Sequence, residues 1–215
     1  MLSTQDKDVI VEAVQDVEAR TGGEIVVSVV PKSEDYSVAA WRAVVFVFLV
    51  VVAVILIVRA TTSDWVPVFL GEDLYLILIA VTAGLIVGSV TSHVPMLQRT
   101  FVLEREFSKA VSRAASEAFI SEEIFATTHR NGILIFVSEL ERMFEVIADS
   151  GIGSQVDSDE WVSIVDLMIQ KRNAAGLVDA IVSGVLACGD LLEKQSPSAG
   201  TDSNELGDQV REQNP

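Results

Sequence analysis

The sequence predicts an α/β protein in which a small sheet, sandwiched between helices, is split by an inserted two-helix transmembrane hairpin. Two observations carry this prediction. Two long apolar runs, residues 38–58 and 74–90, lie before the middle of the chain, and β-branched runs and amphipathic helical patterns stand on either side of them. The order helix, strand, crossover, strand, strand, helix, helix makes the first strand parallel to the second through a right-handed crossover. The hairpin lies inside that crossover.

The apolar runs are long enough to cross a bilayer. As helices they reach about 31 Å and about 26 Å, close to the thickness of the hydrocarbon core. Two core helices of a large soluble protein are the alternative, but the rest of this 215-residue chain is too small to cover both on all sides. Gly84 and Gly88 form a small-xxx-small step, which suits close packing against the first span or against another copy. We therefore expect a hairpin over residues 38–91, with spans at 38–58 and 74–91.

Basic residues near the span ends predict the orientation. Arg59 alone lies in the bridge between the spans, and five basic residues lie on the side of the chain termini: Lys32, Arg42, Arg99, Arg105 and Lys109. Cytoplasmic segments carry such an excess of Lys and Arg. The N-terminal residues are polar and acidic, so no cleavable targeting peptide is expected and the first span acts as an uncleaved signal. The sequence thus predicts a multi-pass protein of the cell (inner) membrane with the soluble domain and both termini in the cytoplasm.

Residues 1–37 are expected to form the first part of the soluble domain. Ser3-x-x-Asp6 resembles a capping box, and apolar residues then recur at helical spacing until Gly22 and Gly23 end the pattern. Glu24–Val30 is rich in β-branched residues and stops at Pro31, which predicts a buried strand.

Residues 92–194 are expected to form the second part. A helix begins near Leu103 and continues, bent, toward Phe125. Residues 133–137 are apolar without alternation, which is typical of a strand covered on both faces. A tight connection to Met143–Ala148 predicts an antiparallel hairpin, and helical patterns follow at 159–172 and 176–193. Residues 195–215 lack periodicity and are rich in Ser, Gly, Gln and Asn, which predicts a disordered tail.

Three stretches resemble the TPM domain family. They are Thr21-Gly-Gly-Glu-Ile-Val-Val-Ser-Val, Asn131-Gly-Ile-Leu-Ile-Phe-Val and Phe144-Glu-Val-Ile-Ala-Asp149-Ser-Gly-Ile152. The chain is similar to the bacterial membrane-anchored type, which carries a transmembrane hairpin after the first strand. The resemblance implies an α/β/α sandwich. It implies one of two functions: an interaction or accessory module of a membrane assembly, or a metal-dependent, acid-phosphatase-like hydrolase.

One acidic constellation is a candidate metal site. Asp149 ends a predicted strand, and Asp157 and Asp159 follow beyond a glycine-bearing loop, where their oxygens can converge on Ca²⁺ or Mg²⁺. The spacing does not match the calcium loop that ends in glutamate. The alternative is structural: Asp149 closes a turn through its own backbone, and Asp157 or Ser158 caps the next helix.

Composition argues against several other classes of function. The sequence contains no phosphate-binding glycine loop ending in Lys-Ser or Lys-Thr. It identifies no catalytic residues, which therefore remain unknown. The prediction therefore leans toward a protein that is not an enzyme. Cys188 is the only cysteine and is expected to be a buried, inert thiol. His93 is expected at the membrane interface and His129 in an exposed turn. A net charge of −16 repels phosphate backbones, so nucleic acid is not an expected partner. The expected partners are the lipid bilayer and, through the hairpin, a membrane protein or a second copy.

Overall fold

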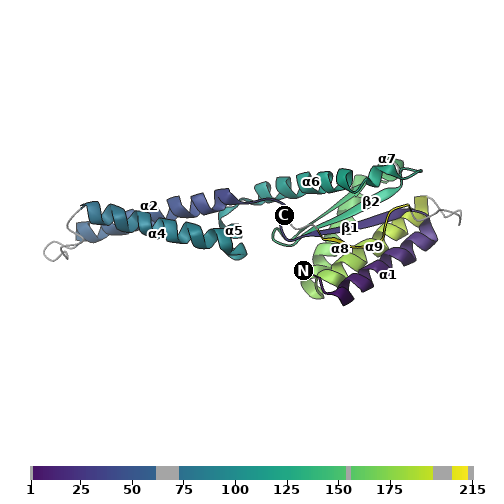
Figure 1. Ribbon diagram of the computed structural model, residues 1–215, viewed down its shortest axis with the longest axis horizontal. Helices are drawn as coiled ribbons and strands as arrows, with labels where there is room; N and C mark the ends of the chain where they lie inside the picture. Colours follow the sequence, from purple (N-terminus) through teal and green to yellow (C-terminus); the bar gives the residue numbers. More distant parts are fainter. Residues whose placement is uncertain (1, 62–72, 154–155, 196–204, 213–215) are drawn as a thin grey trace. The chain divides into compact units, whose positions relative to one another are not determined.

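A computed structural model of the protein describes residues 2–61, 73–153, 156–195 and 205–212 (Figure 1). The chain forms two compact units: the first combines Met1–Glu34 with Ser108–Pro215, and the second is Asp35–Phe107. The second unit therefore interrupts the first within the connection from the first to the second strand. It is longer than the predicted hairpin because a short helix, α5 (Pro95–Phe101), packs on both long helices.

The first unit is built on a mixed sheet in the order β3-β2-β1-β4. Its strands are β1 (Glu24–Val30), β2 (Gly132–Ser138), β3 (Met143–Ala148) and β4 (Arg211–Glu212). β1 and β2 are parallel, with Glu24 opposite Gly132, and β2 and β3 form an antiparallel hairpin. Both pairings confirm what the order of elements predicted.

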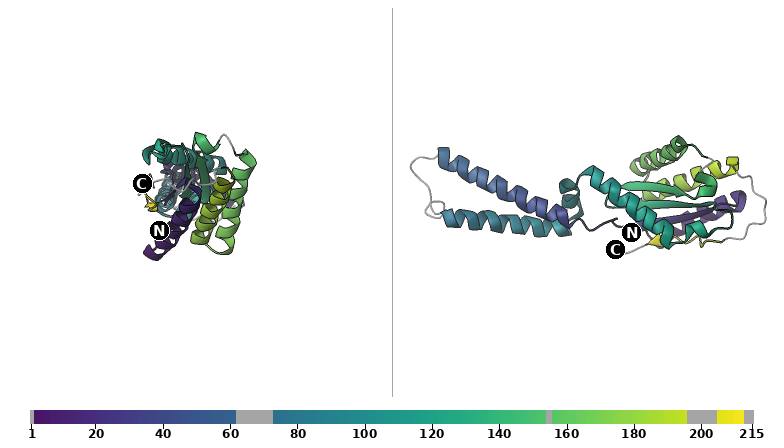
Figure 2. Two further views of the ribbon diagram at one scale, coloured as in Figure 1. Left: turned by 90° about the vertical axis from the view of Figure 1, so that its right-hand side faces the viewer. Right: turned by 90° about the horizontal axis from the view of Figure 1, so that it is seen from above.

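Helices cover both faces of this sheet, which explains why every residue of β1 and β2 is buried (Figures 1 and 2). The helices on one face are α1 (Thr4–Thr21), α8 (Ser158–Ala174) and α9 (Leu177–Gln195), and α6 (Glu104–Ser121) lies on the other. Because side chains alternate along a strand, Ile25 and Val27 join the core under α1, whereas Val26 and Val30 join the core under α6. Alternate side chains of β1 therefore pack in two different cores, one on each face of the sheet.

The predicted limits of α1 are confirmed by its caps. Ser3 is the N-cap: its Oγ accepts the Asp6 N–H at 3.1 Å, and the Asp6 carboxylate accepts the Ser3 N–H at 2.8 Å. Gly22 ends the helix in the left-handed conformation at φ 62°, where glycine has no steric penalty. A Cβ on Gly23 would lie 2.7 Å from the Leu192 side chain, so the chain passes close to α9 as it enters β1.

The second unit contains α2 (Ser37–Thr61) and α4 (Asp73–His93), which pack on each other. Ala80, Gly84 and Gly88 recur every fourth residue on the buried side of α4. A Cβ on Gly84 would lie 3.1 Å from the Val44 carbonyl oxygen, and one on Gly88 would lie 2.4 Å from a Val44 methyl group. The small-xxx-small step therefore packs against α2 of the same chain.

Both long helices are long and apolar enough to cross a membrane. Most of their large apolar side chains are exposed, with Phe46 at 57 %, Leu56 at 60 % and Ile86 at 59 %. Residues 62–72, which make up most of the predicted bridge between the helices, lie outside the described part of the chain.

The C-terminal end differs from the disordered tail that was predicted. Residues 205–212, which we name the C-terminal strap, lie along β1 and end in β4, where Ser28 pairs with Arg211 and Val29 with Glu212. Leu206 and Val210 each pack against a core of the first unit. Residues 196–204 and 213–215 lie outside the described part, so the prediction for them stays a prediction.

Two connections also differ from the expected ones. α6 ends at Ser121 instead of bending onward, because Glu123 takes a left-handed conformation at φ 54° and starts a separate turn, η1 (Ile124–Ala126). The glycine-bearing loop after β3 contains one helical turn, α7 (Ser150–Gly153).

Candidate functional site

Asp149 lies between β3 and α7 and is 4 % exposed. Its Oδ2 is 2.9 Å from Nε of Arg130, and its Oδ1 accepts the Ser150 N–H at 2.6 Å. Its backbone carbonyl accepts the N–H groups of Ile152 and Gly153. The carboxylate is therefore already neutralised by a guanidinium and used by a local turn, as the structural alternative expected.

The backbone of Arg130 passes so close to residue 151 that only glycine fits there. The Gly151 N–H donates to the Arg130 carbonyl at 3.0 Å, and a Cβ would lie 2.5 Å from that oxygen and 2.6 Å from the His129 carbonyl oxygen. The glycine therefore lets α7 rest on the turn before β2. This contact, and not freedom to fold around a cation, accounts for a glycine at this position.

The other two predicted ligands lie at the start of α8. Asp157 is its N-cap, with extended backbone and no side-chain capping bond, and Asp159 lies in the first turn, where acidic groups interact favourably with the helix dipole. Among the described residues, no group of three or more His, Cys, Asp or Glu side chains is arranged to hold a metal ion. Asp149, Asp157 and Asp159 are thus not brought together, and this arrangement lends no support to the predicted Ca²⁺ or Mg²⁺ site.

The remaining reactive side chains occupy ordinary positions. Cys188 is fully buried, and burial raises the pKa of its thiol to about 12, which confirms the expectation of a buried thiol. His129 is exposed before β2. His93 is exposed at the end of α4, with Nδ1 2.8 Å from the Ser89 carbonyl oxygen.

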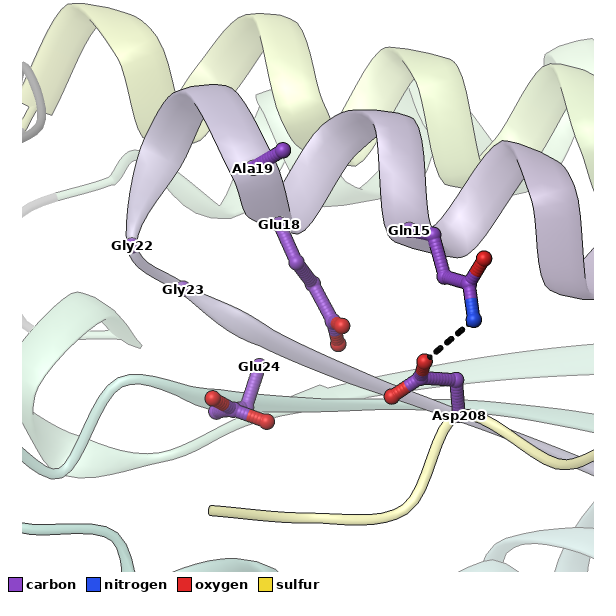
Figure 3. Close-up of a pocket in the computed structure, with 7 residues that line it drawn as sticks. All are labelled: Gln15, Glu18, Ala19, Gly22, Gly23, Glu24 and Asp208. Atoms are coloured by element: carbon purple, nitrogen blue, oxygen red, sulfur yellow. Dashed lines mark hydrogen bonds between the residues drawn. The ribbon is translucent and has the colours of Figure 1, made fainter. Parts of the chain in front are cut away.

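A pocket of about 320 Å³ in the first unit was not predicted from the sequence. It lies where α1 ends, β1 begins and the C-terminal strap passes, and Figure 3 shows its lining. The lining residues are Gln15, Glu18, Ala19, Gly22, Gly23, Glu24 and Asp208. Its polar groups are three carboxyls and one amide, contributed by three separate parts of the chain.

Glu18 points from α1 toward the strap (Figure 3). One of its oxygens accepts the Ile25 N–H at 2.8 Å. Burial raises the pKa of Glu18 to about 8, and the charges of Glu24 and Asp208 and a side-chain hydrogen bond with Asp208 act in the same direction. Glu18 therefore keeps its proton to a higher pH than an exposed glutamate does.

Glu24 and Asp208 complete the pocket. The two Glu24 oxygens accept the consecutive N–H groups of Glu205 and Leu206, each at 3.1 Å. Burial also raises the pKa of Glu24, although these two donors oppose the change. Asp208 accepts a bond from the Gln15 amide at 2.8 Å (Figure 3). Sequence reasoning missed this site because Asp208 lies in a stretch without periodicity.

Comparison with known proteins identifies a similar fold. The chain matches no protein-family model and no curated protein. It is similar to the NMR structure of BA42 protein from the psychrophilic bacterium Bizionia argentinensis, with 18 % identity and a TM-score of 0.60. The match covers 99 % of this chain and 96 % of that chain. At this level of identity the likeness concerns the fold alone, so the chain shares its architecture with a bacterial protein of similar extent.

Proposed function

We propose that this protein is an integral membrane protein that presents a TPM-like α/β domain as an interaction or accessory module of a membrane assembly. The observation that carries the proposal is the exposed apolar surface of α2 and α4. Contiguous apolar surface of this extent is unfavourable in water and is typical of a membrane or protein contact. A bilayer removes it from water along the full length of both helices.

A charged pair supports the placement of the hairpin ends. Arg42, one turn into α2, donates two hydrogen bonds to Glu106, at 2.6 and 2.7 Å, and a third to the Phe101 carbonyl at 3.0 Å. This forked geometry neutralises the arginine without requiring it to reach lipid headgroups. The guanidinium holds the pKa of Glu106 down at about 2, so the pair stays ionised at any physiological pH. Such a pair suits the polar boundary of a membrane, not its centre.

The orientation belongs to the proposal and has a direct test. Thr61 ends α2, and Ser116 is exposed on α6. In intact cells, Thr61→Cys should react with an impermeant thiol reagent, whereas Ser116→Cys should react only after permeabilisation. The wild-type chain is the control, because Cys188 is fully buried. The reverse labelling pattern would place the α/β domain outside the cytoplasm.

The first unit also carries apolar side chains suited to a protein contact. Val162 and Ile169 on α8 are 57 % and 41 % exposed, and a spacing of seven residues puts them on one face of the helix. Asp149 is already paired with Arg130, so the hydrolase that the resemblance offers as an alternative has no favourable arrangement of carboxylates here. The arrangement therefore favours the interaction module over the hydrolase.

Site-specific photocrosslinking in native membranes tests the module. A photoreactive residue at Val162 should give one defined adduct with a membrane protein, whereas the same residue at Ser116, on the opposite side of the sheet, should not. Uniform or missing adducts at both positions would contradict the proposal. Phosphate release by the purified full chain, lost on Asp149→Asn, would favour the hydrolase instead.

A further inference from the structure

Within the described part of the chain, the outer edge of β1 is covered by the C-terminal strap alone. β1 pairs along its whole length with β2 on one side, but on the other side only Ser28 and Val29 pair with β4. An open strand edge presents unpaired backbone groups that can pair with another segment. The strap is thus a segment already bound in the way that an added peptide strand binds.

The edge holds the strap by its backbone at both ends. Near the start of β1, Glu24 accepts the N–H groups of Glu205 and Leu206, each at 3.1 Å. Near the end of β1, the parallel pairing of Ser28 with Arg211 and of Val29 with Glu212 takes over. The first contact uses a bent backbone and the second an extended one, and neither depends on which side chains the strap carries.

Side chains of the strap make the remaining contacts and determine which sequences fit the edge. Leu206 packs against the core under α6, and Val210, four residues later, packs against the core under α1. Arg211 pairs with Glu122 at 2.9 Å, and Glu212 pairs with Lys7 at 2.8 Å. A segment with apolar residues four apart and a following arginine fits this edge if it bends as the strap does, at residues 206 and 209, so that its two apolar side chains reach opposite faces of the sheet.

One strap residue opposes binding. Asp208 enters a pocket whose other carboxyls belong to Glu18 and Glu24, and Gln15 is its neutral donor. Three carboxyls so close together cannot all be ionised, so Glu18 is driven to hold a proton, and holding it above the ordinary pKa of a glutamate costs free energy. The strap is also only half covered: Leu206, Asp208, Val210 and Arg211 are intermediate in exposure, whereas all of β1 is buried. Asp208 therefore makes the strap a weaker occupant than the edge permits.

From these contacts we propose that the outer edge of β1 is a docking site for a segment of a partner protein that follows the path of the strap and carries a basic residue where the strap has Asp208, and that the strap occupies this site as an intramolecular competitor. A lysine there would place its ammonium beside the Glu18 and Glu24 carboxyls and favour the ionised form of Glu18, so that repulsion becomes attraction. This site goes beyond the proposed function and lies entirely within the first unit, so it does not depend on the membrane contact.

Peptide binding to the full chain in detergent tests the proposal. Three labelled octapeptides are compared: the strap sequence Glu-Leu-Gly-Asp-Gln-Val-Arg-Glu, the same sequence with Lys in place of Asp, and a scrambled version of the Lys peptide. The Lys peptide should bind about tenfold more tightly than the strap peptide, the change expected for about 1.4 kcal/mol. Equal affinities for the Lys peptide and its scrambled control would overturn the proposal.

A variant with the competitor weakened provides the matched comparison. Leu206→Asp with Val210→Asp removes both apolar anchors of the strap, and the Lys peptide should then bind at least about tenfold more tightly than to the wild-type chain. Adding Glu24→Gln should reduce that binding, because Glu24 receives the backbone of the bound segment. Unchanged affinity in the anchor variant would show that the strap does not occupy the peptide site.

Hydrogen exchange on the wild-type chain decides the matter if the anchor variant does not fold. The amides of Glu205 and Leu206 should exchange through a local opening, faster than those of Val27 or Ile135, and the Lys peptide should speed their exchange further. Exchange of all four amides only by global unfolding would overturn the proposal. A dimer in which a second copy supplies the strap would overturn it as well.

Discussion

At the residue scale, the main feature is that carboxyl groups removed from water are stabilised in two different ways. Asp149 and Glu106 each face a guanidinium, so their charges are compensated. Glu18 has no basic partner in its pocket, and its carboxyl is stabilised by protonation instead. Neighbouring groups thus lower the pKa of one glutamate, Glu106, and raise the pKa of another, Glu18.

Replacing Glu18 by Gln should remove part of the pH dependence of stability. The pKa of Glu18 rises from 4.5 to about 8 on folding, so the folded state holds a proton that the unfolded state has lost between these values. The wild-type chain should lose stability as the pH rises from about 5 to about 8. Gln keeps an oxygen for the Ile25 N–H, and Glu18→Gln should be more stable than wild type at pH 8 by on the order of 1 kcal/mol, after allowance for solvent screening.

Chemical denaturation at pH 5 and pH 8 measures this difference, with Glu12→Gln, on the exposed side of α1, as the control. Parallel pH profiles for wild type and Glu18→Gln would show that Glu18 is ionised in the folded protein.

At the scale of elements, α2 and α4 pair through small residues. Without a hydrophobic driving force between helices in lipid, close packing supplies much of the attraction. A Cβ on Gly88 would lie 2.4 Å from a Val44 methyl group and 3.2 Å from the Ala40 carbonyl oxygen, and the backbone oxygen has nowhere to move. The helices therefore approach each other only because position 88 lacks a side chain.

Gly88→Leu should separate the two helices. Overpacking a tight contact costs about 1–3 kcal/mol. Spin labels at Val45 and Leu85, which are exposed on α2 and α4, should lie farther apart in a lipid-reconstituted chain with Gly88→Leu than in the same labelled chain without it. Ile86→Leu, on the exposed side of α4, is the control and should leave the distance between the labels unchanged. Equal distances in all three chains would mean that Gly88 is not part of the contact.

At the scale of the whole molecule, one folded unit contains another within its chain. The cores of the first unit draw on α1, β1, α6, β2, β3, α8, α9 and the strap, and none of their residues belongs to the second unit. The two ends created by the insertion lie near each other, because Glu34 forms an ion pair with Arg113 of α6 at 3.0 Å. Closing such a gap with a longer or shorter segment has a small entropic cost.

The first unit should therefore fold without the second. Replacing residues 35–103 by a short Gly/Ser linker should give a water-soluble protein that unfolds in one cooperative transition, as followed by circular dichroism and calorimetry. Val27→Asp in the same shortened chain is the control and should abolish the transition, because Val27 is 2 % exposed between β2 and α1. A shortened protein that lacks a cooperative transition would show that the first unit depends on the hairpin.

The amino-acid sequence alone determined the type and position of those elements whose residue pattern recurs over many positions. The helix of residues 4–21 with its capping box, the parallel pairing of β1 with β2, and the two apolar helices all follow from periodicity, β-branched runs and glycine breaks. These features could be predicted because each is encoded by the residues that form it. Asp149 was also expected at the end of a strand, and it directly follows Ala148, the last residue of β3.

Tertiary structure decided the remainder, because the interactions involved join residues far apart in the sequence. Arg130 reaches Asp149 only because the turn before β2 lies beside α7. A two-residue strand such as β4 carries no periodic signal, and its position depends on an edge built by β1, on the Glu24 carboxylate of β1 and on Lys7 of α1. The pocket of Glu18, Glu24 and Asp208 exists only once that strap is in place, so its chemistry is a property of the folded chain and not of any one segment.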